Sequence, residues 1–208
     1  MGRSNTLLST KKNQDALFER GFKSWCENTA VAIRKRLGIN SSSPLSPYDL
    51  AIKLGVTVWK LEDVTGLGQE TREYLTSTQG DEWSAITVLV NGEEIILINP
   101  THSPARQSTD LMHELAHIIR KHDAAQVFLS ESGYALRTFN EKQEAEADWF
   151  AGTLLLPRSV LEYCTYNHLP LYTILQDYTV SKMLYSCRIR MTGINKQYRK
   201  NFKPQQSI

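Results

Sequence analysis

The sequence has few cysteines and no long apolar run. Its three cysteines, Cys26, Cys164 and Cys187, are odd in number, far apart and in no C-x-x-C arrangement. They therefore indicate neither a disulfide framework nor a cysteine zinc site. No segment approaches the roughly 20 apolar residues that cross a bilayer, and the N-terminal segment lacks the apolar stretch of a signal peptide. We expect a cytoplasmic protein that makes no membrane contact.

The sequence also lacks an excess of charge of one sign. Lys and Arg number 24 against 22 for Asp and Glu, and only the stretch 196–203 is distinctly basic. This pattern is not typical of a dedicated nucleic-acid surface, so we expect no direct binding of nucleic acid. The 208 residues, 41% of them hydrophobic, suffice for one domain with a sizeable core.

Two helices are predicted near the N-terminus. Apolar residues at helical spacing over 12–37 predict a long amphipathic helix, which stops at Gly38. A Ser/Pro-rich break follows. Pro47, preceded by a serine cap, then opens a short second helix that stops at Gly55.

A small, mainly antiparallel sheet is predicted next. Segment 56–64 has the composition of a strand, and β-rich runs at 83–90 and 93–100 flank the dipeptide Asn91-Gly92. This dipeptide is the one that best fits a tight hairpin turn. The hairpin is the basis for expecting antiparallel pairing.

The remaining segments are predicted to be helical. Ser108 or Thr109 is expected to cap a helix that runs to about residue 122, and a strong helix over 141–157 follows. Short helices precede the C-terminal tail. We predict an α+β fold, in which the small sheet packs on these two helices and further helices lie at both ends.

The same pattern divides the chain into three segments. Residues 1–44 hold the N-terminal amphipathic helix and the Ser/Pro linker, residues 45–195 hold the functional domain, and residues 196–208 form a basic polar tail.

The motif that carries chemistry is H-E-x-x-H, formed by His113, Glu114 and His117. Two histidines four apart on a helix lie one turn above each other, so both imidazoles can reach one ion. The glutamate beside the first histidine is aimed at the open position of that ion. The spacing predicts a zinc peptidase with one Zn²⁺ per chain, in which Glu114 activates the attacking water as general base.

A catalytic zinc also needs a third protein ligand. The acidic helix offers Glu141, Glu144, Glu146 and Asp148. Glu144 and Asp148 are four apart and share a face, so Glu144 is predicted to bind zinc and Asp148 to accept the outer N–H of a zinc-bound histidine. Glu146 is predicted to point the other way, and Glu141 to be a solvated surface charge.

The other histidines are predicted to lie outside the zinc shell. His122 is expected near the helix end, where it interacts favourably with the helix dipole. His102 and His168 are expected to be ordinary surface residues. A group that stabilises the tetrahedral oxyanion is also expected, and Tyr134, Arg137 and His122 are the candidates among which the sequence does not choose.

Several segments together resemble one family. Its most specific part is the pairing of HELAH with E-x-E-A-x-x-x-F-A-x-x-L-L-x-P at 144–157, and the resemblance extends over about 45–195, including DLAIKLGVTV, NGEEIILINP and TVSKMLYSCRIRMTG. The chain resembles the ImmA/IrrE family of bacterial and phage metallopeptidases. The first helix lies outside the resemblance.

The resemblance implies a thermolysin-like zinc peptidase. In this family the third ligand is a glutamate followed four residues later by Asp or Asn, a pattern that falls on Glu144 and Asp148. The implied substrate is a helix-turn-helix transcriptional repressor, often encoded beside the peptidase in a mobile element or stress regulon. Ala116 stands where the family commonly has Gly, and Asp148 where it commonly has Asn, and neither change removes a ligand or the base.

Two rival hypotheses remain. The first is a zinc-containing sensor or regulator-binding protein without turnover, against which the intact Glu114 and the three-ligand shell argue, because structural zinc usually has four protein ligands. The second is a DNA-binding regulator, since 45–66 superficially resembles the first part of a helix-turn-helix. Its second half, VTVWKL, is β-branched and aromatic where a recognition helix should be polar.

Overall fold

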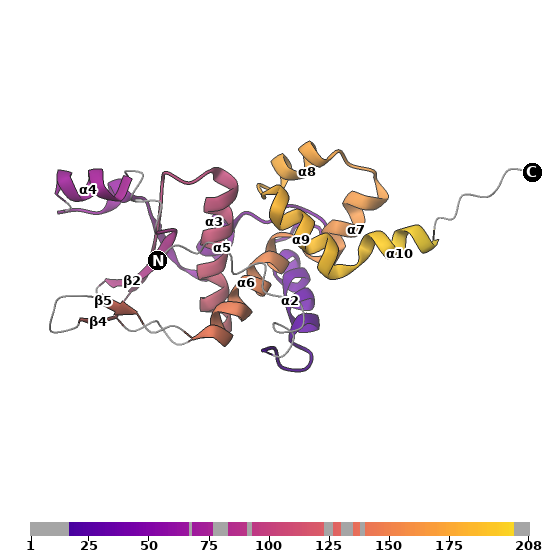
Figure 1. Ribbon diagram of the computed structural model, residues 1–208, viewed down its shortest axis with the longest axis horizontal. Coiled ribbons are helices and arrows are strands. Elements are labelled where there is room, and N and C mark those ends of the chain that lie inside the picture. The colour runs from indigo at the N-terminus through magenta and orange to yellow at the C-terminus, as the bar shows by residue number, and fades with distance from the viewer. Residues whose placement is uncertain are drawn as a thin grey trace, which may run out of the picture.

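The computed structural model describes residues 17–66, 68–76, 83–90, 93–122, 127–129, 135–137 and 140–201. Its fold is α+β, as predicted, and it is mostly helical with a small mixed sheet. The helices are α2 (Phe22–Arg36), α3 (Pro47–Leu54), α4 (Gln69–Thr76), α5 (Pro104–Arg120), α6 (Glu141–Leu155), α7 (Arg158–Tyr166), α8 (Leu171–Asp177), α9 (Lys182–Thr192) and α10 (Ile194–Asn201). The strands are β1 (Thr57–Trp59), β2 (Ala85–Val90), β3 (Glu93–Ile98), β4 (Val127–Leu129) and β5 (Ala135–Arg137). Figure 1 shows α5 and α6 between the strands on one side and α7 to α10 on the other.

The sheet has the strand order β1-β3-β2. β2 and β3 pair antiparallel with Val90 opposite Glu93, so two residues connect them, as the predicted hairpin requires. Asn91 and Gly92 themselves lie outside the described residues. β1 pairs parallel with β3, which makes the sheet mixed, and β4 and β5 form a separate antiparallel pair.

The segment predicted as a strand at 56–64 is shorter than expected. β1 ends at Trp59, and a 3-10 helix, η2 (Leu61–Asp63), follows it. No recognition helix follows α3 in this segment, because the chain pairs with β3 instead. α4 was not predicted, since its sequence QETREYLT has few apolar residues and presents no apolar stripe.

Several helix ends differ from the predictions. α5 begins at Pro104 after the N-cap Ser103, five or six residues earlier than the predicted cap at Ser108 or Thr109. The reason is that proline is favoured at the first helical position, where its missing N–H has no partner to lose. α2 begins at Phe22, later than the predicted residue 12, after Gly21 in a left-handed conformation with φ of 89°. The basic tail starts as a helix, because α10 extends to Asn201.

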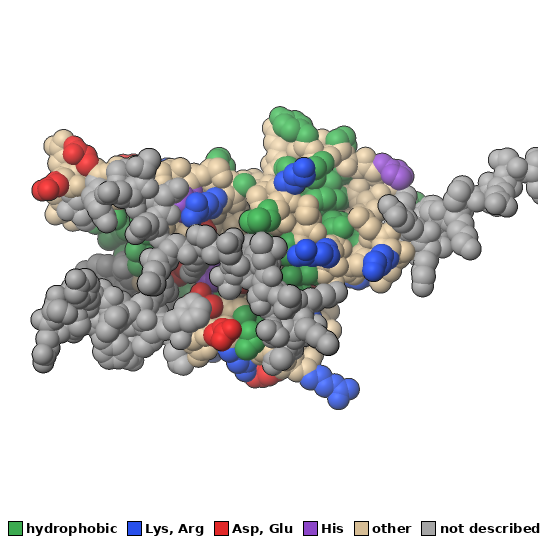
Figure 2. Space-filling model, viewed as in Figure 1, with side chains coloured by type: hydrophobic (Ala, Val, Ile, Leu, Met, Phe, Trp, Pro, Cys, Tyr) green, Lys and Arg blue, Asp and Glu red, His purple; other side chains and the backbone are tan. Residues whose placement is uncertain are grey.

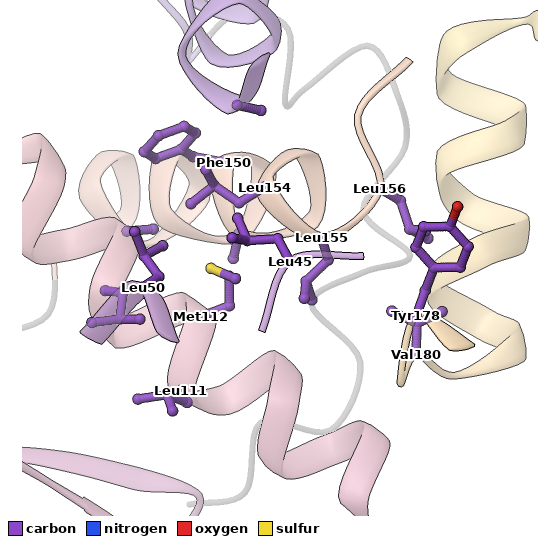
Figure 3. Packing of buried hydrophobic residues seen from close by; sticks show 14 of the residues in the cluster. Leu45, Leu50, Leu111, Met112, Phe150, Leu154, Leu155, Leu156, Tyr178 and Val180 are labelled. Carbon is purple, nitrogen blue, oxygen red and sulfur yellow. The ribbon is translucent and has the colours of Figure 1, made fainter. Parts of the chain in front are cut away.

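The core lies where α5, α6 and α3 meet. Met112 of α5, Phe150 and Leu154 of α6, and Leu50 of α3 are 0–1% exposed and lie close together in Figure 3. Fully burying one such side chain stabilises the fold by about 1.5–3 kcal/mol. The packing of α5 against α6 fixes the relative position of the side chains on the other faces of these two helices.

Two buried arginines hold the C-terminal end of α6. Arg34 of α2 donates from Nη2 to the carbonyl oxygens of Leu154 at 2.9 Å and Leu155 at 3.3 Å. Arg188 of α9 donates from Nε to the carbonyl oxygen of Leu156 at 3.1 Å. These carbonyls are among those that a helix end leaves without an intrahelical partner. Side chains from α2 and α9 therefore donate hydrogen bonds to the carbonyl oxygens at the end of α6.

We expect Arg34→Ala to lower the free energy of unfolding by about 3–5 kcal/mol, because it leaves buried carbonyl oxygens without donors and opens a cavity. Urea unfolding followed by circular dichroism measures this change. Arg36→Ala is the matched control, since Arg36 is exposed on the same helix, and it should change stability by less than about 0.5 kcal/mol. Equal effects of the two substitutions would show that the contacts of Arg34 with α6 contribute little.

The C-terminal helices also carry exposed apolar side chains. In Figure 2 hydrophobic side chains gather over the region where Figure 1 places α7 to α9. The largest exposed ones in these helices are Tyr163, Tyr166, Leu171, Tyr172 and Met183. Within the described ranges, none of the helices has the length and hydrophobicity that a bilayer-spanning helix needs.

Candidate metal centre

α5 and α6 bring three predicted ligands together. Nε2 of His113 lies 3.0 Å from Nε2 of His117. Carboxylate oxygens of Glu144 lie 3.3 Å from Nε2 of His113 and 3.7 Å from Nε2 of His117. The ligand atoms of these residues all lie within 4.8 Å of one another. The two histidines come from successive turns of α5, and Glu144 comes from the first turn of α6.

The donor set fits zinc. In a tetrahedral site with ligands about 2.0–2.1 Å from the ion, the ligand atoms are about 3.3 Å apart. The observed separations of 3.0, 3.3 and 3.7 Å bracket that value. Two imidazoles and one carboxylate are also the protein ligands of known catalytic zinc sites with one open position. His113, His117 and Glu144 could therefore hold one zinc ion.

Glu114 lies beside this group and is only 3% exposed. Its Oε2 accepts a hydrogen bond of 2.7 Å from the hydroxyl of Thr87 on β2. Its Oε1 is buried and has no hydrogen-bond partner among the described residues. A buried carboxylate oxygen without a partner is costly unless a ligand or water satisfies it. Glu114 thus keeps one oxygen for a group that enters the site.

His113 has a direct carboxylate partner behind it. Its Nδ1 lies 2.8 Å from Oδ1 of Asp148, one turn beyond Glu144 on α6. Because an ionised carboxylate only accepts hydrogen bonds, Nδ1 is the nitrogen that donates to Asp148, and Nε2 is the atom that could bind an ion. This geometry is the one expected of Asp148 from the i, i+4 spacing.

His117 has a different arrangement behind it. Its Nδ1 lies 3.0 Å from Nδ1 of His122, and Nε2 of His122 lies 3.3 Å from Oε2 of Glu146. Arg120 donates to that same oxygen from Nε at 3.0 Å and from Nη2 at 2.5 Å. Burial lowers the pKa of His122, while hydrogen bonding to Glu146 opposes this. His122 lies after Lys121, which ends α5 with φ of 55°, and not in the last turn of the helix.

Glu146 is the residue whose environment the sequence did not reveal. Its carboxylate contacts Arg120 of α5 and His122 just after that helix, and Glu146 is only 2% exposed. Thr87 and Arg120 were not predicted to contribute either. The sequence does offer one signal, since a histidine close behind the H-E-x-x-H motif and a glutamate two residues after Glu144 are both present. Glu141 is exposed, as predicted.

The prediction for His102 is wrong. His102 is 5% exposed, and its Nδ1 lies 2.9 Å from Oδ2 of Asp110, which lies on α5. This contact depends on where α5 begins, which the sequence pattern placed five or six residues too late. His168 is exposed, as predicted. Of the oxyanion candidates, Tyr134 lies outside the described residues, and the structure describes the backbone of Arg137 but not its side chain.

A comparison with models of known protein families finds a metallopeptidase family. The family model described as the IrrE N-terminal-like domain, Peptidase_M78, matches residues 63–190, more than half of the chain. The chain belongs to the ImmA/IrrE family of metallopeptidases. The matched region contains all three candidate ligands and Glu114, whereas α2 and α3 precede it.

The ImmA/IrrE chain also resembles a solved structure at a distance. That structure is a Mycobacterium tuberculosis transcriptional regulator, with a TM-score of 0.46 and 11% sequence identity, and the match covers 86% of this chain and 48% of that one. The chain thus spans about half the length of the regulator. A likeness at this level carries no information on function. No curated protein matches the sequence.

Proposed function

We propose that the chain is a zinc-dependent endopeptidase of the gluzincin type, in which His113, His117 and Glu144 hold one Zn²⁺. The observation that carries this proposal is the set of three ligand atoms within 4.8 Å of one another beside the buried Oε1 of Glu114. Membership of a metallopeptidase family supports it.

The side chains divide the chemistry among them. Zinc, when bound, supplies a Lewis acid that polarises the scissile carbonyl and makes water acidic near neutral pH. Oε1 of Glu114 takes the proton of the attacking water and passes it to the leaving amine. Thr87 holds the other oxygen of Glu114, so that the carboxylate keeps one orientation during this transfer. Asp148 holds the ring of His113 in the tautomer with its lone pair on Nε2.

We infer that the substrate is a helix-turn-helix transcriptional repressor in the bacterial cytoplasm. The basis is the resemblance to the ImmA/IrrE family, whose members act on such repressors in phage, mobile-element and stress-response systems. Cleavage of the repressor would then release the genes that it controls. The peptidase itself needs no contact with DNA for this role.

Metal content and peptide cleavage together test this function. We expect the protein purified in the presence of zinc to hold about one zinc per chain by elemental analysis. It should cleave members of a peptide library, as detected by mass spectrometry. A chelator should abolish cleavage, and Zn²⁺ should restore it. If the chain holds no zinc after metal-replete purification, the proposal fails. If zinc binds without any cleavage, the chain is instead a zinc-containing sensor.

A further inference from the structure

The ring of His117 is connected through side chains to the N-terminal helix. Behind it lie His122 and then Glu146, at contacts of 3.0 and 3.3 Å. Arg120 holds Glu146 with two nitrogens. The guanidinium of Arg120 in turn lies 4.9 Å from the ring centre of Trp25 and 5.2 Å from that of Phe22, both on α2.

The hydrogen-bonding capacity of these groups fixes one arrangement of protons. Glu146, paired with Arg120, only accepts, so Nε2 of His122 must donate to it. A neutral imidazole that donates from Nε2 accepts at Nδ1. Nδ1 of His117 must therefore donate to His122, and the lone pair of His117 lies on Nε2. That is the atom that faces His113 and Glu144.

The two candidate histidine ligands thus reach the same tautomer by different routes. Asp148 accepts directly from Nδ1 of His113 at 2.8 Å. For His117 the carboxylate of Glu146 acts through an intervening imidazole. Glu146 and His122 have side chains only 3% and 6% exposed, whereas that of Asp148 is 42% exposed. Because water competes less with buried hydrogen bonds, the arrangement behind His117 is the better shielded of the two.

We propose that His122, Glu146 and Arg120 form a positioning relay that sets the tautomer and orientation of His117, and that α2 supports this relay through Trp25 and Phe22. The inference rests on the proposed zinc centre. It gives α2, which lies before the matched region, a role in metal binding. It also assigns His122 to the support of a ligand, since both of its nitrogens are engaged away from the site.

Disrupting a relay of this kind should lower zinc affinity. Disrupting a purely structural ion pair between α5 and α6 should not. Removing the outer partner of a metal-binding histidine typically weakens metal binding about 10- to 100-fold. We expect His122→Phe, which keeps a ring but has no nitrogen, to lower zinc affinity by that factor in competition with a chromogenic chelator. His122→Asn should restore most of it, because its amide oxygen can accept from Nδ1 of His117.

Nitrogen-15 NMR of the metal-free full-length chain gives a second readout. We expect His117 to be protonated at Nδ1 in the unsubstituted protein and to become a mixture of tautomers in His122→Phe. His168→Asn is the control, since His168 is exposed and its φ of 52° is one that asparagine tolerates. Thermal unfolding of each variant checks that it is folded. If His122→Phe does not fold, the zinc affinity and the His117 tautomer are measured in His122→Asn instead.

The part played by α2 has its own variant. Trp25→Leu keeps apolar contact with Phe150 but removes the ring beside Arg120. We expect zinc affinity to fall about two- to fivefold, the change that corresponds to an exposed cation–π contact. Val31→Ala, an exposed apolar position on the same helix, should leave it unchanged. An unchanged affinity in Trp25→Leu would remove α2 from the relay.

The outcomes separate this inference from the proposed function. If the unsubstituted chain binds one zinc and His122→Phe binds it equally well with an unaltered His117 tautomer, the relay is refuted and the zinc centre stands. If the unsubstituted chain binds no zinc, the proposed function fails, and the relay fails with it. A loss of affinity in His122→Phe that His122→Asn restores supports both.

Discussion

Replacing Glu114 with glutamine is expected to stop peptide cleavage while the protein keeps its zinc. The amide has the shape of the carboxylate and can still accept the hydrogen bond from Thr87, so the packing around the site should not change. It cannot take a proton from water at neutral pH. Loss of a general base typically lowers the rate about 10²- to 10⁴-fold. The measurement is the cleavage rate of one library peptide, with elemental analysis of the same sample.

Glu141→Gln is the matched control. Glu141 is an exposed glutamate in the first turn of α6, so both its rate and its zinc content should equal those of the unsubstituted protein. A Glu114→Gln protein that loses its zinc would mean that Glu114 supports the metal site instead of acting only as base. Full activity in Glu114→Gln would assign the proton transfer to another group.

The sequence predicts the parts of the site that one helix places by itself. His113 and His117 face the same way because residues four apart lie one turn above each other, and the same reasoning selects Glu144 and Asp148 on the second helix. The structure brings His113, His117 and Glu144 together and puts Asp148 behind His113. Helical spacing is a local property, and it can be read without knowing the fold.

The parts that depend on how α5 meets α6 could not be predicted in this way. Glu146 was predicted to point away from the site. In the structure its carboxylate contacts Arg120 and His122, because α6 packs against α5 there. His122 follows a left-handed residue at the end of α5, and its ring position depends on that local turn. Neither the turn nor the helix crossing leaves a periodic signal.

Errors in element boundaries have equally physical causes. The cap of α5 was predicted at Ser108 or Thr109, but the proline after Ser103 starts the helix earlier. α4 has residues that favour helix but no apolar stripe, so the pattern that detects buried helices passed over it. The parallel pairing of β1 with β3 joins segments far apart in the sequence, which a hairpin signal does not report.

Removing the third ligand should have the largest effect on metal content. We expect Glu144→Ala to lower zinc affinity by at least about 100-fold and to abolish cleavage, because loss of a direct ligand must exceed the about 10- to 100-fold cost of losing an outer partner. His113→Ala should behave in the same way. Zinc content after gel filtration and chelator competition measure both changes.

Asp148→Ala distinguishes ligand from support on the same helix face. Its Oδ1 contacts Nδ1 of His113, whereas Glu144 contacts Nε2, so only Glu144 lies on the side where the three ligand atoms converge. Asp148→Ala should therefore keep zinc at saturating concentration and lose affinity about 10- to 100-fold. If Glu144→Ala retains zinc while Asp148→Ala loses it entirely, the third ligand lies one turn further along α6. The proton arrangement inferred for His113 would then be reversed.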